Sequence, residues 1–319
     1  MFSISQEAVR IVREQILPCV EQLNCQVHQL KNGATLVDMG VYAPGGWLAG
    51  KLFVEATIGG LGHVDFGRFR LGQIDLPSID VYIDHPATAG LSSQFSSWPL
   101  PRSEVPGTIH PMGSGPARAI ARIDPFAQAW EYQDNHHETV FAIQAAVLPD
   151  EALAEEVARQ CHISPRNLYI LAAKTGSIAG SIQVCSRTVE TSIWRLHKCG
   201  FDLHKVICGM GTCPVAPPAS DEFQAMVRVN AAVIYGGLVR YVVNATDEEI
   251  KAVIDGLPTR AARRYGEPFS KLLEEGGRDI FKTEKDIHSL ARYEIMNYAT
   301  GNVFASGTIE EAYLQELFF

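Results

Sequence analysis

Apolar residues near the start of the chain recur every three or four positions, which is the spacing of one helical face. Over residues 5–23 they are Ala8, Val9, Val12, Ile16, Val20 and Leu23. This spacing predicts a helix with Ser5 as its N-cap and a kink or division at Pro18.

The next patterns predict strands. Lys31-Asn32-Gly33 lies between two extended apolar runs, and Asn-Gly in that setting predicts a β-hairpin. The segment APGGWLAGKLFVEATIGGLG predicts a short apolar strand among glycines. Residues 84–118 are rich in Pro, Ser and Gly and predict a long irregular stretch. A stretch of that length commonly lines a functional site.

Helices and strands intermix in the second half. Pro149-Asp150 opens a predicted helix, which leads into the strand NLYILAA and the turn KTGSIAG. SIQVCSR then reads as a strand, and TVETSIWRLHKCG as a helix that Gly200 terminates. Thr246 and Glu249 predict a capping box for a helix ending at Gly256-Leu257-Pro258. YEIMNYATGNVFASG predicts a final hairpin.

This mixture indicates an α/β (α+β) fold with two mixed α/β domains. A chain of 319 residues exceeds the usual size of one core, and we place the domains at 1–130 and 131–319. GWLAG and GSIAG echo each other before a predicted strand, which is compatible with an internal duplication.

Composition narrows the classes of partner. The net charge is -9 at pH 7 and Lys and Arg form no run, which argues against nucleic acid and anionic membranes as partners. No window of 18 apolar residues predicts a membrane span, and the first helix is amphipathic rather than a signal peptide. Seven cysteines without CxxC spacing indicate reduced thiols and a cytoplasmic protein.

Most catalytic motifs are absent. There is no P-loop, no GxGxxG that opens a helix after a strand, no GxSxG and no HExxH. His136-His137-Glu138 are adjacent, so we expect their side chains to diverge and to hold no metal. Cys208 and Cys213 are expected to be small buried residues. We therefore expect neither a metal nor a nucleotide cofactor.

Two features could carry chemistry. The glycine-rich segment 112–118 is expected to open a short helix, where Arg118 either grips a ligand oxygen or is simply solvated. Arg187 and Glu190 are three residues apart, so both emerge on one helical face after a predicted strand. A surface salt bridge is the competing interpretation of this pair. The small-residue turn at 174–183 before it favours a substrate site.

Eight blocks carry a resemblance to a known family. In order they are GGLG at 59–62, SSQFSSW at 92–98, GSGPARA at 113–119, GSIAGSIQ at 176–183, SRTVET at 186–191, GFDLHKV from Gly200, the segment Pro214 to Pro218, and Tyr235-Gly236-Gly237. Together they resemble the methenyltetrahydromethanopterin cyclohydrolases of methanogens and methylotrophic bacteria.

The resemblance implies an enzyme that reversibly hydrolyses 5,10-methenyl-tetrahydromethanopterin to the 5-formyl form. It also implies a pterin cleft between two domains, and a homo-oligomer with a trimer favoured. Arg187 and Glu190 match the family's catalytic pair. The residues expected to bind the substrate are Gln94, Ser114, Arg118, Gln183, Asn230 and Ser289.

The chain also departs from the family pattern. Ala231 replaces an acidic residue, and Leu290 and Arg292 replace proline and glutamate. These changes keep two alternatives open: a divergent paralogue acting on another pterin or a folate, and a non-catalytic pterin carrier. A scaffold or interaction protein is a third alternative, which the lack of low-complexity tails and repeat arrays disfavours. Retention of the Arg–Glu pair favours the enzyme.

Overall fold

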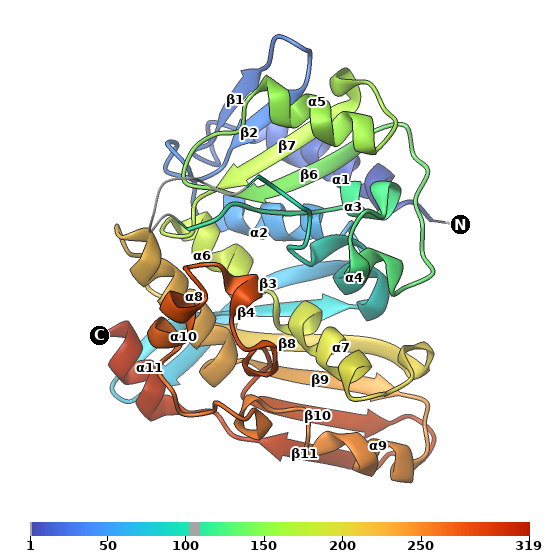
Figure 1. The fold of residues 1–319 in the computed structure, drawn as a ribbon, viewed down its shortest axis with the longest axis vertical. Coiled ribbons are helices and arrows are strands. Elements are labelled where there is room, and N and C mark those ends of the chain that lie inside the picture. Colours follow the sequence, from blue (N-terminus) through green and yellow to red (C-terminus); the bar gives the residue numbers. More distant parts are fainter. Residues whose placement is uncertain (1, 102–108) are drawn as a thin grey trace. The chain divides into compact units, whose positions relative to one another are not determined.

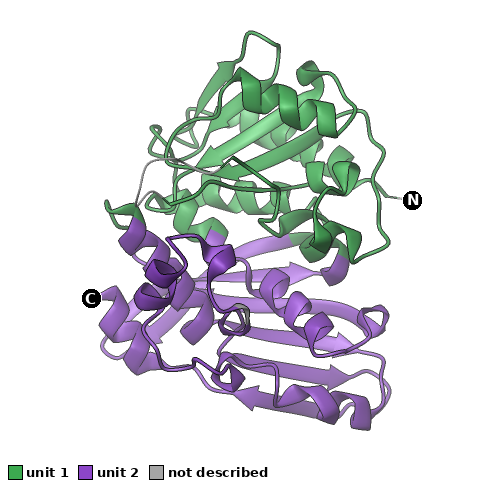
Figure 2. Ribbon diagram, in the orientation of Figure 1, with its two compact units in different colours: residues 1–62, 88–183, 218–222 green, residues 63–87, 184–217, 223–319 purple. Residues whose placement is uncertain are grey.

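The computed structural model describes residues 2–101 and 109–319, coloured along the chain in Figure 1. The chain forms two compact units, and each is assembled from separate stretches of sequence (Figure 2). Unit 1 contains residues 1–62, 88–183 and 218–222, and unit 2 contains residues 63–87, 184–217 and 223–319. The approximate boundary that the sequence suggested near residue 130 falls inside unit 1.

Unit 1 is built on a mixed five-stranded sheet with the order β1-β2-β7-β6-β5, in which β2, β7 and β6 are parallel. The strands are β1 (Gln26–Gln29), β2 (Thr35–Asp38), β5 (Met112–Ser114), β6 (Thr139–Gln144) and β7 (Leu168–Ala173). The helices are α1 (Ile4–Ile11), η1 (Val12–Ile16), η2 (Leu17–Cys19), α2 (Trp47–Thr57), η3 (Thr88–Gln94), α3 (Ala117–Ala121), α4 (Pro125–Gln128), α5 (Glu151–Gln160), η4 (Pro165–Asn167) and the first part of α6 (Ile178–Cys185).

Both faces of this sheet are covered. Alternate residues of a strand point to opposite faces, and in β7 one set packs with α1 and α2 and the other with α3 and α5. Tyr169 and Leu171 belong to the first cluster, whereas Leu168 and Ile170 belong to the second. Unit 1 is therefore a three-layer α/β/α sandwich, which explains why the apolar run NLYILAA is continuous rather than alternating.

Unit 2 is built on a mixed six-stranded sheet with the order β11-β10-β9-β8-β4-β3, in which β10 and β9 are the parallel pair. The strands are β3 (Gly62–Leu71), β4 (Ile74–Ile83), β8 (Val206–Pro214), β9 (Leu238–Val243), β10 (Arg292–Asn297) and β11 (Val303–Gly307). The helices are α7 (Thr188–Lys198), η5 (Leu203–Lys205), α8 (Glu222–Gly236), α9 (Asp247–Ile254), η6 (Thr259–Ala261), α10 (Phe269–Glu275), η7 (Ile280–Lys282), η8 (Lys285–Ile287) and α11 (Glu311–Phe318).

Helices α7 and α9 lie on one face of this second sheet, with α7 against β8 and β9 and α9 against β10 and β11 (Figure 1). The burial of β10 follows the same arrangement, since Tyr293 and Ile295 are buried while Met296 is exposed. The mixed α/β class predicted from the sequence is thus confirmed for both units. None of the helices in the described part of the chain has the length and hydropathy of a membrane-spanning segment.

Several local predictions are confirmed. Asn32-Gly33 joins antiparallel strands β1 and β2, and the final hairpin pairs β10 with β11. Thr246 and Glu249 form the capping box of α9. Gly200 follows the end of α7 with a φ of 82°, a conformation that favours glycine.

Three predictions are wrong. The N-cap of the first helix is Ser3, because its side chain accepts a hydrogen bond from the Gln6 backbone N–H, whereas the Ser5 hydroxyl lies 3.0 Å from that of Thr139. The glycine-rich segment before residue 62 forms helix α2, and SIQVCSR lies mainly in helix α6, where the sequence suggested strands. A Cβ on Gly50 of α2 would lie 2.7 Å from the side chain of Ile182 in α6, so the small residues serve close helix packing.

Candidate active site

The pair singled out by spacing lies at the start of α7. Arg187 is the N-cap residue of this helix and Glu190 is in its first turn. Nη1 of Arg187 lies 3.6 Å from Oε1 of Glu190. The two residues are 9% and 5% exposed, so this ion pair is buried, unlike an ordinary surface salt bridge.

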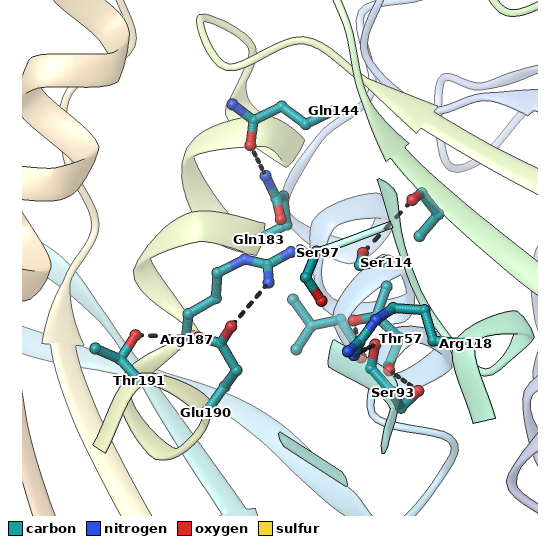
Figure 3. A network of polar contacts seen from close by, with 12 residues as sticks. Thr57, Ser93, Ser97, Ser114, Arg118, Gln144, Gln183, Arg187, Glu190 and Thr191 are labelled. Carbon is teal, nitrogen blue, oxygen red and sulfur yellow. Dashed lines mark hydrogen bonds and ion pairs between the residues drawn. The ribbon is translucent and has the colours of Figure 1, made fainter. Parts of the chain in front are cut away.

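The Glu190 carboxylate has a second neighbour on its other oxygen. Thr191 Oγ1 donates a hydrogen bond of 3.0 Å to Oε2 of Glu190. Figure 3 shows the carboxylate between the Arg187 guanidinium and the Thr191 hydroxyl. Its two oxygens therefore have different partners, one a cation and one a neutral hydroxyl.

Buried polar contacts hold the first turn of α7 on the sheet. Tyr241 of β9 donates a hydrogen bond of 3.0 Å to the carbonyl oxygen of Val189 and is 2.7 Å from Ser192 Oγ. Burial raises the pKa of the Tyr241 phenol well above its usual value, and the nearby Glu190 charge acts in the same direction. The phenol is therefore protonated and serves as a donor beneath the helix.

Strand β8 approaches the same turn very closely. An ideal Cβ on Gly211 would lie 1.9 Å from Oγ1 of Thr188, the first residue of α7. Only glycine leaves room for this approach without a shift. The position of the Arg187–Glu190 turn thus depends on β8 as well as on β9.

The cysteines form no disulfide. This holds for all seven of them and agrees with the prediction from their spacing. Cys213 is buried, which confirms that part of the prediction, and burial together with neighbouring Cys185 raises the pKa of its thiol. Cys208 is only partly buried, because it lies on a half-exposed part of β8.

Arg118 lies at the predicted helix start in unit 1, yet its guanidinium is fully buried and bound within the protein. Nε and Nη2 bind the two carboxylate oxygens of Asp124 at 3.0 and 2.7 Å. Nη1 donates to the carbonyl oxygen of Ser93 at 3.0 Å (Figure 3). Burial alone would raise the pKa of Asp124, but the charge and hydrogen bonds of Arg118 outweigh it and the pKa is lowered.

The other predicted residues of unit 1 are also buried. Gln94 ends η3 directly after Ser93, whose carbonyl Arg118 binds. The Ser114 hydroxyl lies 3.5 Å from the carbonyl oxygen of Ala142. Nε2 of Gln183 donates a hydrogen bond of 2.6 Å to Oε1 of Gln144, and this bond orients the side-chain amide of Gln183 (Figure 3).

Within the described residues, the remaining two predicted residues of unit 2 form hydrogen bonds away from the Arg187–Glu190 turn. Asn230 Nδ2 donates to the carbonyl oxygen of Met226, one turn earlier on α8. The Ser289 hydroxyl donates to the carbonyl oxygen of Leu257 and lies 2.7 Å from the hydroxyl of Tyr293.

The histidine pair corrects a geometric expectation. Potential ligand atoms of His136, His137 and Glu138 all lie within 4.8 Å of one another, so the side chains converge rather than diverge. The loop that carries them is anchored by Asp134, which accepts hydrogen bonds from the backbone of Asn135 and His136. Both oxygens of Glu138 are bound by the Arg13 guanidinium, whose positive charge opposes a cation at this position.

Sequence reasoning missed the partners of the predicted residues. Thr191, Tyr241, Asp124 and Gln144 each bind a predicted residue or its helix turn. Only Thr191 gave a local signal, since its hydroxyl directly follows Glu190 in the sequence. The other three are brought into contact by the fold.

Comparison with known proteins gives one consistent result. The profile of the family described as Cyclohydrolase (MCH) matches residues 3–318. The chain is 34% identical over 310 residues to a methenyltetrahydromethanopterin cyclohydrolase of Methanospirillum hungatei, covering 97% of this chain and 96% of that protein. It is 35% identical over 322 residues to the enzyme of that name from Methanocaldococcus jannaschii, covering 99% and 98%. The relative from Methanothermobacter marburgensis is 35% identical over 327 residues, covering 100% and 99%.

Proposed function

The chain belongs to the Cyclohydrolase (MCH) family, and we propose that Arg187 and Glu190 carry out its reaction. The chain is a methenyltetrahydromethanopterin cyclohydrolase. The reaction adds water to the 5,10-methenyl pterin and yields the 5-formyl pterin. The observation that carries the proposal is the buried Arg187–Glu190 ion pair at the start of α7.

The chemistry of the substrate sets what the protein must supply. The methenyl carbon is bonded to two nitrogens that share a positive charge, so it is already electrophilic. The protein has to orient a water molecule, accept its proton and let one nitrogen leave as a protonated amine. Glu190 is the proposed base, and general base catalysis contributes about 10²–10⁴-fold to the rate. Orientation of the water adds to that factor.

Arg187 has a different proposed role. A cation beside a carboxylate favours the ionised form and weakens the carboxylate as a base. At 3.6 Å the pair is beyond hydrogen-bond distance, whereas Arg118 binds Asp124 through two short bonds. Arg187 therefore orients Glu190 without clamping both of its oxygens, and its charge stabilises the oxygen that develops on the attacked carbon.

The substrate-binding roles extend the proposal to both units. Gln94, Ser114, Gln183, Asn230 and Ser289 are proposed to contribute to the pterin site, and Arg118 to act indirectly through Ser93 and Gln94. The pterin cleft, an internal duplication, a homotrimer and the absence of a metal requirement stay predictions.

One assay tests the proposed function. Incubation of the purified chain with the methenyl pterin should bleach its near-ultraviolet absorbance at a rate proportional to the protein concentration. A pterin carrier would instead bind the compound, which equilibrium dialysis detects, and leave the spontaneous rate of bleaching unchanged. That second result would reject the enzymatic assignment.

A further inference from the structure

Two neighbouring hydroxyl residues of α7 use their side chains differently. Serine and threonine inside a helix commonly return the hydroxyl to a carbonyl three or four residues earlier. Ser192 does this, with bonds of 2.6 Å to the carbonyl oxygen of Thr188 and 3.1 Å to that of Val189. The Thr191 hydroxyl instead donates a hydrogen bond of 3.0 Å to the Glu190 carboxylate. This choice of acceptor distinguishes Thr191 from an ordinary helix threonine.

We infer that Thr191 is a positioning residue, whose hydroxyl fixes the Glu190 carboxylate in its reactive orientation and keeps it ionised. The inference rests on the proposed role of Glu190 as the base. Arg187 lies on Oε1 and Thr191 on Oε2, so the two contacts together restrict rotation of the carboxylate. A hydroxyl that donates to a carboxylate stabilises the charged form relative to the acid.

Loss of this hydroxyl has two separable consequences. A carboxylate without the donor is protonated at higher pH, so the acidic limb of the kcat/KM profile should move upward. A hydrogen bond to a charged group is strong enough for a shift of roughly one pH unit. Poorer orientation should also lower kcat about tenfold at neutral pH, while KM changes less because Thr191 does not hold the pterin.

Three variants test the inference by following loss of the methenyl absorbance between pH 5 and pH 9. Thr191→Val removes the hydroxyl and keeps the shape of the side chain, whereas Thr191→Ser keeps the hydroxyl. Ser192→Ala is the matched control, because it removes a hydroxyl from the next position whose bonds go to the helix backbone and Tyr241. It should lower the melting temperature and leave the acidic limb in place.

The expected result is an acidic limb displaced upward in Thr191→Val alone, with Thr191→Ser close to wild type. Two outcomes would overturn the inference: superimposable profiles for the valine and serine variants, or a valine profile lowered equally at every pH. If Thr191→Val does not fold, Thr191→Ala replaces it as the variant without the hydroxyl. An acidic limb at higher pH in Thr191→Ala than in Thr191→Ser then supports the inference, and identical limbs refute it. Failure of the proposed function is distinct, because then the wild-type protein itself would not bleach the pterin.

Discussion

Replacement of Arg118 by alanine should destabilise unit 1 strongly, because it leaves a buried carboxylate without its cation. Asp124 is 2% exposed and would keep only its bonds from Ser97 and from the backbone of Phe126 and Ala127. Removal of one partner of a buried ion pair costs about 3–5 kcal/mol. At about 2–4 °C per kcal/mol for domains of this size, the melting temperature should fall by roughly 6–20 °C.

The chain offers a control pair of almost identical geometry. Arg159 binds Glu156 through bonds of 2.9 and 2.7 Å, close to the 3.0 and 2.7 Å of Arg118 and Asp124. The Arg159 side chain is 67% exposed, so Arg159→Ala should leave the melting temperature nearly unchanged.

Thermal unfolding followed by circular dichroism compares the two variants directly. Equal losses would refute the reasoning that burial, rather than pairing geometry, sets the cost. At a temperature where Arg118→Ala remains folded, KM for the pterin should rise more than kcat falls, because Arg118 holds the carbonyl of Ser93 beside Gln94. A large fall in kcat with unchanged KM would place Arg118 in the chemistry instead.

Two further predictions concern unit 2. Burial lowers the pKa of His288 to about 4, so its neutral form is favoured in the folded state and stability is lost as pH falls from 6.5 toward 4. Relative to His288→Gln, the wild type should lose about 2 kcal/mol between pH 7 and pH 5 in urea unfolding, and parallel curves would contradict this. Gly211→Ala places a Cβ 1.9 Å from Thr188 Oγ1 and should cost about 1–3 kcal/mol with a loss of turnover. Gly256→Ala, whose nearest contact would be 3.5 Å, is the control and should retain turnover; equal losses would contradict the steric argument.

Features set by neighbouring residues could be predicted from the sequence. The Asn32-Gly33 hairpin and the capping box of Thr246 and Glu249 depend only on residues a few positions apart. The same is true of Arg187 and Glu190, whose three-residue spacing places them on one helical face. In these cases local chemistry and the final fold agree.

Features set by packing could not be predicted in the same way. Helix α2 accommodates Gly50 because α6 packs closely against this position, but glycine by itself disfavours a helix. The pairing of Arg118 with Asp124 was missed for a related reason, since it requires the loop between these two residues to be folded. Tyr241 lies about fifty residues from the helix turn that it supports, and no local pattern connects them.

The most direct test of the proposed mechanism is the turnover of Glu190→Gln, measured by loss of the methenyl absorbance. Glutamine keeps the shape and hydrogen-bonding reach of Glu190 but cannot accept a proton at neutral pH. We predict that kcat falls by about 10²–10⁴-fold, while thermal unfolding shows a folded protein. A folded Glu190→Gln variant that retains more than half of the wild-type turnover would contradict the assignment of Glu190 as the base.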